Sequence, residues 1–241
     1  MSSIIMLKLE KVSKSFGDVK AVEDITFEVE NGEFVFITGA SGAGKTTVIK
    51  LILREYLPDT GQIIIDGEDI TKAKDKEIPK IRQQIGVVFQ DFKVLSERTL
   101  RENIEVALAV AKVPQNEWKE RVNHVLKLVG LMERGNFFPS QLAGGELQRT
   151  ALARALVINP KVILADEPTG NLDWETADSI MDLFDKINKE GKTIIMATHH
   201  KGIIDKMKKR VIEIEKGKIV KDSGKKESHK EKPKEEVAEE K

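Results

Sequence analysis

The spacing of apolar residues along the chain predicts strands in its first third. Phe27 and Val29 alternate with polar neighbours, as in a strand that buries one face. The run at 33–38 is mostly apolar and ends at a glycine, which is typical of a parallel strand buried on both faces. Helical spacing at 46–56 and an apolar strand at 63–65 follow, so this part mixes strands with a helix.

The middle of the chain, from about residue 91 to 157, has helical spacing instead. Two sets of apolar residues recur mostly at intervals of three or four, which places each set on one face of a helix. The sets are Leu100, Ile104, Leu108 and Ala111, and then Trp118, Val122, Val125, Leu126 and Val129. We therefore expect a helical subdomain at about 91–157.

Strands return in the last third of the chain. Apolar runs at 162–165 and 194–197 flank a helical pattern at 176–189. Such a strand–helix–strand unit predicts two parallel strands joined by a right-handed crossover. Apolar residues on both sides of Gly217, within 211–221, predict a closing hairpin.

The residues after 222 differ from the rest in composition. The segment 223–241 holds six lysines and six glutamates, and its only apolar residues are Val237 and Ala238. Such a segment cannot bury enough apolar surface to offset the chain entropy lost on ordering, which predicts a charged, disordered tail. A fluctuating single helix in its last part is the alternative.

Composition narrows the classes of function. Of 241 residues, 40 are Lys or Arg and 40 are Asp or Glu, so no net charge attracts nucleic acid or an anionic membrane. The absence of cysteine excludes disulfides and thiolate metal sites. No apolar run reaches the ~18–20 residues of a spanning helix, and the N-terminus lacks the pattern of a signal peptide. We therefore expect a cytoplasmic protein that binds no nucleic acid and reaches a membrane only through a partner.

A glycine-rich segment after the strand at 33–38 predicts a phosphate-binding loop. It reads Gly39-Ala40-Ser41-Gly42-Ala43-Gly44-Lys45-Thr46 and is followed by Thr47. The backbone of such a loop wraps closely around a polyphosphate, with its N–H groups and the next helix N-terminus facing the negative charge. Lys45 would reach the β- and γ-phosphates of ATP, and the Thr46 hydroxyl would bind Mg²⁺. A glycine-rich turn without a ligand is the alternative.

Two carboxylates follow the apolar run at 162–165. Asp166 is placed to join the Mg²⁺ shell, and Glu167, one residue on, to act as the general base that polarises the attacking water. Solvated acids at a strand end are the alternative. A phosphate loop needs an acid on its metal side, however, and this need favours the catalytic interpretation.

A second glycine-rich helix start predicts another anion-binding position. Its residues are Ala143, Gly144, Gly145 and Glu146. Glycines at a helix N-terminus expose backbone N–H groups to an anion. Because one chain needs only one phosphate cradle, the second one suggests contact with the γ-phosphate of a nucleotide held by another subunit.

The segment 141–149 resembles the signature of the ABC ATPase family, and other family motifs stand in the expected order. By this resemblance, Phe16 stacks on adenine, with a place in the core as its alternative. Gln90 senses Mg²⁺ and the γ-phosphate. Asp173 communicates across a dimer interface, and His199 stabilises the γ-phosphate.

The resemblance covers about 7–222 and implies a fold and an activity. The implied fold is α/β: a P-loop NTPase cassette with a parallel core sheet, an N-terminal antiparallel β subdomain and an inserted α-helical subdomain. Residues 1–222 would form this nucleotide-binding domain. Two copies would bind ATP and Mg²⁺ head to tail and hydrolyse the ATP, and this homodimer would drive an integral membrane protein. The chain would then lie on the inner face of the cell membrane.

One position departs from the family pattern. The family signature has a serine where this chain has Ala143. That hydroxyl donates to the γ-phosphate, and a hydrogen bond to a charged group contributes ~1.5–3 kcal/mol. Its loss predicts roughly a tenfold or larger drop in affinity or rate. We expect weakened, but not abolished, ATP binding between two copies.

The segment 165–173 is typical of family members that act as mechanical drivers, in which a membrane partner transmits force. Four further segments, 32–45, 77–82, 85–92 and 195–199, resemble the cell-division members of this group. The ATPase of an export or lipoprotein-release transporter is the alternative, since it shares the catalytic motifs. A soluble ABC protein acting on ribosomes or DNA is a remote one, because this chain has one cassette, no coiled-coil insertion and no net charge.

Overall fold

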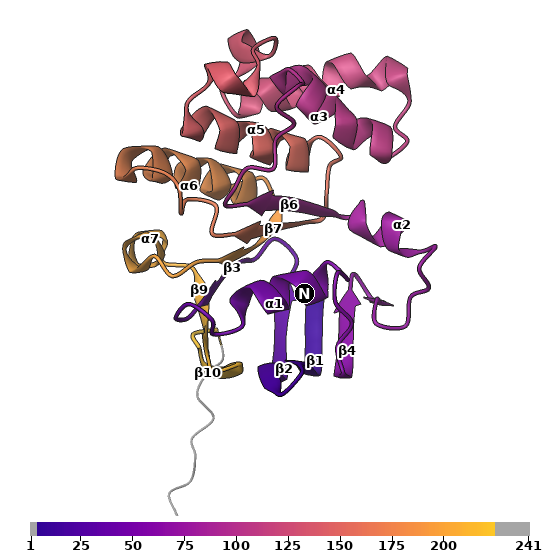
Figure 1. Ribbon diagram of the computed structural model, residues 1–241, viewed down its shortest axis with the longest axis vertical. Helices are drawn as coiled ribbons and strands as arrows, with labels where there is room; N and C mark the ends of the chain where they lie inside the picture. The colour runs from indigo at the N-terminus through magenta and orange to yellow at the C-terminus, as the bar shows by residue number, and fades with distance from the viewer. Residues whose placement is uncertain (1–3, 225–241) are drawn as a thin grey trace, which may run out of the picture.

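Two sheets and the helices around them make up the computed structural model, which describes residues 4–224 (Figure 1). The first sheet is antiparallel and has the strand order β2-β1-β4-β5. Its strands are β1 (Ile5–Phe16), β2 (Val19–Glu30), β4 (Thr60–Ile65) and β5 (Glu68–Asp69). Leu9 of β1 pairs with Phe27 of β2 and Ile63 of β4, and all three side chains are buried. The alternation of apolar and polar residues thus gives this sheet one buried face.

The second sheet has six strands in the order β10-β9-β3-β8-β7-β6. These strands are β3 (Phe34–Thr38), β6 (Ile85–Phe89), β7 (Val162–Asp166), β8 (Thr193–Ala197), β9 (Arg210–Glu215) and β10 (Lys218–Asp222). Neighbouring strands are parallel except in the β9–β10 hairpin. The predicted parallel strands and the predicted closing hairpin are therefore confirmed.

Both faces of the six-stranded sheet are covered, which explains why its strands are apolar without alternation. Val35 and Ile37 of β3 lie in a core shared with α1 and the antiparallel sheet. Phe34 and Phe36, on the opposite face, lie in a second core formed with the other helices. Strands β7 and β8 divide their side chains between the two cores in the same way.

The helices lie on both faces of the six-stranded sheet. They are α1 (Lys45–Ile52), α2 (Ile78–Arg82), α3 (Leu100–Val110), α4 (Gln115–Leu128), α5 (Gly144–Leu156), α6 (Trp174–Lys189) and α7 (Lys201–Met207), with 3₁₀ turns at Met132–Arg134 and Pro139–Gln141. Figure 1 shows α3, α4 and α5 in the layer farthest from the antiparallel sheet, with α6 below them and α1 between the two sheets. The expected α/β fold, with a parallel core sheet and an antiparallel sheet, is confirmed. The subdomain borders at 91 and 157 stay a prediction.

Two helix boundaries differ from the sequence expectation. Helix α1 ends at Ile52 instead of continuing to 56, because Arg54 takes a left-handed φ of 57° and its Nε donates to the Ile70 carbonyl at 3.0 Å. Helix α6 begins at Trp174, two residues earlier than expected, because Asp173 caps its N-terminus.

The last described residues bear on the predicted tail and on the predicted domain boundary. Hydrogen bonding of the β9–β10 hairpin continues to Ser223, whose N–H donates to the Val211 carbonyl at 2.9 Å. The predicted disordered tail at 223–241 otherwise lies outside the described residues, and the domain boundary at 222 stays a prediction. Within 4–224, no helix combines the length and the apolar character that crossing a membrane requires.

Candidate nucleotide site

The predicted phosphate loop joins β3 to α1, and close contacts require two of its glycines. Gly39 has a φ of 151°, and a Cβ there would collide with the Ile214 carbonyl of β9. Gly44 has a φ of 109°, and a Cβ there would lie 2.5 Å from the Ala21 carbonyl oxygen of β2. Strands of both sheets therefore shape the loop, and only glycine meets both demands.

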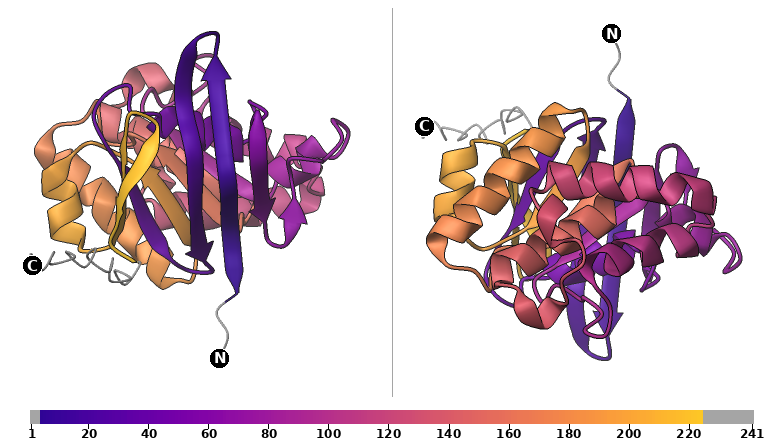
Figure 2. Two further views of the ribbon diagram at one scale, coloured as in Figure 1. Left: turned by 90° about the horizontal axis from the view of Figure 1, so that it is seen from below. Right: turned by 90° about the horizontal axis from the view of Figure 1, so that it is seen from above.

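The β9–β10 turn also contacts the phosphate loop. The Gly217 N–H donates to the Ala43 carbonyl at 3.0 Å, and the Gly217 carbonyl accepts from the Glu23 N–H at 2.8 Å. The left view of Figure 2 shows this hairpin beside the long strands of the antiparallel sheet. The turn thus links the loop, near the start of the chain, to a hairpin near the end of the described residues.

Lys45 is held inside the loop at the first position of α1. It is 8% exposed, and its ammonium donates to the carbonyl oxygens of Gly39 at 2.9 Å and Ala40 at 3.1 Å. Its Nζ also lies 3.9 Å from Glu167 Oε1. A buried positive charge therefore points into the space that the loop encloses.

The two predicted carboxylates stand at the end of β7. Asp166 Oδ1 accepts from the Thr46 hydroxyl at 3.4 Å. Burial raises the pKa of Asp166 above its usual value, although the Thr46 hydrogen bond acts in the opposite direction. Glu167 has a left-handed φ of 48°, and its N–H donates to the Ala197 carbonyl at 2.9 Å. This unfavourable backbone conformation is the kind that persists where a side chain must be aimed.

His199 follows β8 and contacts Glu167. Its Nδ1 lies 2.7 Å from Glu167 Oε1, and its backbone N–H lies 3.4 Å from Oε2. A carboxylate can only accept, so Nδ1 carries a proton in this contact. The His199 side chain is 66% exposed and that of Glu167 only 16%. The imidazole therefore lies at the surface over a mostly buried carboxylate.

These groups line one hollow of about 550 Å³, named the phosphate hollow. Its lining residues are Val19, Lys20, Ala21, Ser41, Gly42, Gly44, Lys45, Thr46, Thr47, Gln90, Glu167 and His199. The structure therefore brings the predicted loop together with Gln90, the predicted base and the predicted histidine. Sequence analysis did not identify the three β2 residues, because their position depends on how the antiparallel sheet meets the loop.

Gln90 is held by Asn171, which sequence analysis did not single out. Gln90 Nε2 donates to Asn171 Oδ1 at 2.9 Å, and Asn171 Nδ2 donates to the Gln90 carbonyl at 3.0 Å. A Cβ at Gly170 would lie 2.9 Å from Gln90 Nε2, so the chain approaches Gln90 closely. The available signal was the place of Asn171 inside the motif at 165–173.

The residues of the predicted signature do not line the phosphate hollow. Gly144 is the first residue of α5, and Glu146 Oε2 accepts from the Ala143 N–H at 3.0 Å. This bond is half of a capping box, since the alanine side chain has no oxygen to accept a hydrogen bond from the Glu146 N–H in return. A Cβ at Gly145 would collide with Thr176, so the start of α5 packs tightly on α6. The second predicted anion position therefore lies apart from the chain's own phosphate loop.

Helix α5 also holds the ends of β6 and β7. The buried Gln148 donates from Nε2 to the carbonyls of Phe89 at 3.3 Å and Pro168 at 2.5 Å. Arg154 donates to the Phe92 carbonyl at 3.0 Å. These contacts connect the signature helix to the chain on both sides of Gln90. They were not predicted, because they depend on tertiary packing alone.

Asp173 acts within the chain as the N-cap of α6. Its carboxylate accepts from the Thr176 N–H at 3.0 Å and the Thr176 hydroxyl at 2.6 Å. These hydrogen bonds hold the pKa of Asp173 below its usual value. Communication across a dimer interface stays a prediction for this residue.

Phe16 lies at the edge of the phosphate hollow and not in the core. It is 43% exposed, so the core alternative is wrong. Its ring contacts Tyr56 edge-on with centroids 5.0 Å apart. Across the β1–β2 turn it pairs with Val19, which lines the hollow. Stacking on adenine at this rim stays a prediction.

The oxygen donors near the loop fit Mg²⁺. The Thr46 hydroxyl touches Asp166, and Gln90 lines the same hollow. Within 4–224, no group of three or more His, Cys, Asp or Glu could hold a metal ion. Mg²⁺ in phosphoryl-transfer sites takes one or two carboxylates and fills its shell with water and substrate phosphates. The oxygens of Thr46, Asp166 and Gln90 beside a phosphate loop are therefore a suitable ligand set for this ion.

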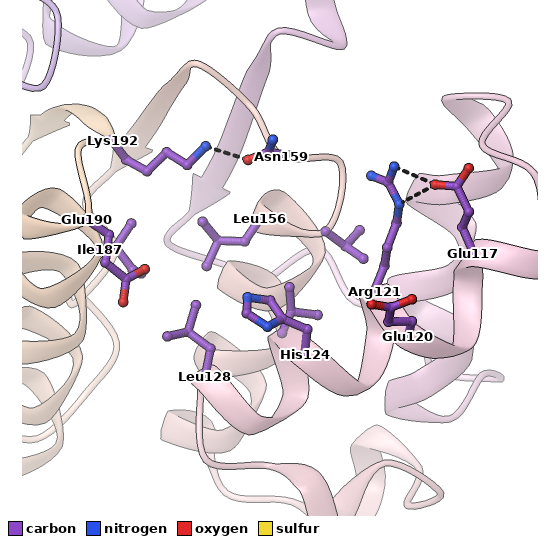
Figure 3. Close-up of a pocket in the computed structure, with 12 residues that line it drawn as sticks. Glu117, Glu120, Arg121, His124, Leu128, Leu156, Asn159, Ile187, Glu190 and Lys192 are labelled. Atoms are coloured by element: carbon purple, nitrogen blue, oxygen red, sulfur yellow. Dashed lines mark hydrogen bonds and ion pairs between the residues drawn. The ribbon is translucent and has the colours of Figure 1, made fainter.

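A second hollow, of about 600 Å³ and named the helical hollow, lies between α4 and the ends of α5 and α6 (Figure 3). It is lined by Glu117, Glu120, Arg121, His124, Val125, Leu128, Leu156, Val157, Asn159, Ile187, Glu190 and Lys192. Two of its charged side chains pair locally, Arg121 with Glu117 and Lys192 with Asn159, both at 2.6 Å. No predicted site residue is among its lining residues.

Comparison with known proteins agrees with this geometry. The family model described as ABC transporter matches residues 22–170. The cell division ATP-binding protein FtsE of Bacillus subtilis is 49% identical over 218 residues, which cover 90% of this chain and 96% of that protein. The methionine import ATP-binding protein MetN of Geobacillus kaustophilus is 45% identical over 220 residues, which cover 89% of this chain and 64% of that protein.

A solved structure is similar in fold as well. The ATP-binding cassette MJ0796, in a dimeric post-hydrolysis state bound to ADP and Pi, has a TM-score of 0.80 at 35% identity. The match covers 90% of this chain and 97% of that one. The family match includes the phosphate loop, the paired carboxylates of β7 and the glycine-rich start of α5. The chain therefore belongs to the ABC transporter family and is one of its ATPases.

Proposed function

We propose that two copies of this chain bind Mg-ATP between them, hydrolyse it and drive an integral membrane protein of the FtsX type. The observation that carries the proposal is the phosphate hollow, where a buried lysine, a carboxylate and an imidazole surround a phosphate loop. The start of α5 lies outside this hollow, which supports a site completed by a second copy. The dimeric state of the similar cassette MJ0796 supports the same arrangement.

ATP binding begins at the phosphate loop. Lys45 exchanges its contacts with the Gly39 and Ala40 carbonyls for oxygens of the β- and γ-phosphates, with which an ammonium bonds more strongly. The loop N–H groups and the N-terminus of α1 face the same oxygens. Phe16, at the rim of the hollow, stacks on the adenine.

Three residues would hold the metal ion. Thr46 and Gln90 would bind it directly, and Asp166 through water. When bound, Mg²⁺ neutralises charge on the phosphate oxygens and so favours attack by water.

Hydrolysis depends on Glu167 and His199. Glu167 accepts a proton from the attacking water while the water oxygen bonds to the γ-phosphorus and the bond to ADP breaks. The contact at 2.7 Å lets His199 orient this carboxylate, and the imidazole then stabilises the γ-phosphate. Catalysis is therefore mainly positioning and electrostatics, as in other phosphoryl-transfer enzymes.

The second copy completes the site. Its residues 143–146 present the N-terminus of α5 to the γ-phosphate, and its Asp173 senses closure at the interface. Repulsion between the products reopens the dimer, and the cycle of closing and opening moves the membrane partner. The surface at 91–95, directly after Gln90, forms the groove for that partner.

The identity to FtsE of Bacillus subtilis, 49%, supports a role in cell division. In this role the chain lies on the inner face of the cell membrane. Its partner transmits the ATP cycle across the membrane and so controls the hydrolases that cut peptidoglycan outside the cell.

An affinity pull-down of the full chain from its own detergent-solubilised membranes, with ATP present, tests this role. The expected result is a membrane protein with few spans and an extracellular domain that binds wall hydrolases. A Lys45→Ala bait is the matched control, since it should recover less of the same partner. Recovery of an export permease, a lipoprotein-release pair or a methionine permease would refute the division role and leave the ATPase mechanism standing.

A further inference from the structure

We infer that Trp174 is a positioning residue whose indole holds the segment that carries His199. The inference rests on the proposed function, because the position of His199 affects turnover only if this site hydrolyses ATP. Trp174 is the first residue of α6 and is 52% exposed. Its ring lies 5.1 Å from the ring of His200, with 39° between the ring planes.

The indole also lies against Gly202. A Cβ at Gly202 would be 2.9 Å from Trp174 Cη2 and 3.8 Å from His200 Cε1. Only a residue without a side chain therefore leaves the indole in its place. His200 is the N-cap of α7 and Gly202 lies in its first turn. Trp174 therefore packs against two residues at the start of this helix.

His199 itself makes few contacts, so its place depends on its neighbours in the chain. Its side chain is 66% exposed and hydrogen-bonds to Glu167. On one side, Thr198 is 1% exposed and its N–H donates to a β3 carbonyl at 3.0 Å. On the other side, His200 lies against Trp174. Removing the indole would therefore loosen one of the two flanks that hold His199, leaving the backbone hydrogen bonds of His200 in place.

The side chain of His200 itself has few other contacts that would orient it. Within the described chain, His200 Nδ1 is buried without a hydrogen-bond partner, so packing against the indole orients this ring. A polar link between α7 and α6 is the pair of Lys206 and Asp178 at 2.9 Å. Both side chains are partly exposed, and exposed ion pairs contribute little. Ile203 anchors α7 in the core shared with α6, and the indole is the aromatic contact that holds His200, at the N-cap, against α6.

Steady-state kinetics of the full chain test the inference. Trp174→Ala should lower kcat about five- to tenfold while KM for ATP stays nearly unchanged, because the phosphate loop and Lys45 bind ATP before His199 acts in hydrolysis. Trp174→Phe, which keeps an aromatic ring, should restore most of the rate. Gly202→Ala should lower kcat by displacing the indole, and the double variant with Trp174→Ala should be no slower than Trp174→Ala alone.

The second tryptophan provides the control. Trp118 donates from Nε1 to the Val113 carbonyl at 2.9 Å, on α4 and remote from His199 in the fold. Trp118→Phe should leave kcat and KM unchanged. A loss in Trp118→Phe equal to that in Trp174→Ala would mean general destabilisation and would overturn the inference.

Histidine NMR gives a readout that a merely structural role would not move. The chain has four histidines, so their ring signals can be assigned by single substitutions. Trp174→Ala should shift the signals of His199 and His200 and leave that of His124 in place. A folded Trp174→Ala variant with wild-type kcat and an unshifted His199 signal would overturn the inference. A wild-type chain without ATPase activity would instead refute the proposed function, and the His199 signal would still test the positioning.

Discussion

The phosphate hollow and the helical hollow have similar volumes, about 550 and about 600 Å³, but their charged side chains have different kinds of partner. In the helical hollow, Arg121 and Lys192 have side-chain partners among the lining residues, as the dashed lines of Figure 3 show. In the phosphate hollow, Lys45 is held only by backbone carbonyls and by a carboxylate 3.9 Å away. Asp166, just behind the loop, keeps a raised pKa.

The difference shows that the volume of a hollow does not identify a functional site. Backbone conformations and buried charges that are unfavourable without a ligand do. The helical hollow is a gap between helices in which Arg121 pairs with Glu117 and Lys192 with Asn159. Around the phosphate hollow, Glu167 has an unfavourable φ, and the burial of Asp166 disfavours its charged form. Bound Mg²⁺ would favour the charged form of Asp166, and both features are of the kind that gathers at functional sites.

The largest difference between the hollows is expected in the rate of phosphate release when one glutamate of each is substituted. Glu167→Gln should lower the rate of phosphate release by about 10²–10⁴-fold, because an amide cannot accept the proton of the attacking water. ATP binding should persist, since the amide has the shape of the carboxylate. Glu120→Gln, on the wall of the helical hollow, should leave the rate unchanged. A phosphate-release assay that finds normal turnover in Glu167→Gln would refute its role as general base.

A pair of lysines sharpens the comparison further. Both donate to backbone carbonyls, Lys45 to Gly39 and Ala40, and Lys192 to Pro160. Lys45→Ala should weaken ATP affinity roughly 10- to 150-fold, the loss of ~1.5–3 kcal/mol from a charged hydrogen bond. Lys192→Ala should reduce stability and leave the affinity unchanged. Calorimetric titration with ATP measures the affinity of each variant. Equal ATP affinities for Lys45→Ala and Lys192→Ala would contradict the difference proposed between the two hollows.

Ala143→Ser should raise ATPase activity by up to about tenfold, since a hydroxyl can donate to the γ-phosphate. The same hydroxyl would also cap α5 and add about 0.5–2 kcal/mol of stability. Pro114→Ser is the matched control, because it places a capping serine three residues before Glu117 at the start of α4. Only Ala143→Ser should change the rate. An unchanged or lower rate in Ala143→Ser would exclude the phosphate contact.

The smallest expected effect is on stability without nucleotide. Burial raises the pKa of Asp166, so the native state disfavours its charged form at neutral pH. Asp166→Asn should therefore raise Tm, by about 2–4 °C for each kcal/mol of stability gained in a chain of this length. Thermal unfolding without ATP, with Glu190→Gln of the helical hollow as an unchanged control, measures the shift.

The pH dependence of this gain has a definite sign. Below the ordinary Asp pKa of about 3.9, Asp166 is neutral in both the folded and unfolded states, so the asparagine gives no advantage. As pH rises through the raised folded pKa, the wild type loses stability and the gain from Asp166→Asn grows. A gain that is largest in acid would contradict the burial argument.

The parts of the fold that depend on neighbouring residues could be predicted from the sequence. The strand at 33–38, its loop and the next helix form one continuous segment, so spacing and glycines were sufficient. The parallel pairing of β7 and β8 followed from a single strand–helix–strand unit. The early end of α1 was missed, because Arg54 leaves the helix to reach a carbonyl of a distant turn.

The candidate site was predicted in its residue types but not in its contacts. The motifs placed Gln90, Glu167 and His199, and the structure brings them to one hollow. The bonds of Asn171 to Gln90 depend on packing between distant segments, so no local pattern could show them. For Phe16 the sequence left the core and the adenine site open, and its exposure follows from its place at the end of β1.

The contact of the phosphate loop with the β9–β10 hairpin has a consequence for synthesis on the ribosome. Gly39 lies directly against the Ile214 carbonyl, and Ala43 accepts a hydrogen bond from Gly217. The nascent chain therefore emerges with its loop long before the strand that gives the loop its shape. A chain cut off before the hairpin would carry every residue of the loop and still lack two of its supports. Competence to bind a nucleotide should thus arrive late in translation, and truncated products should not compete for ATP.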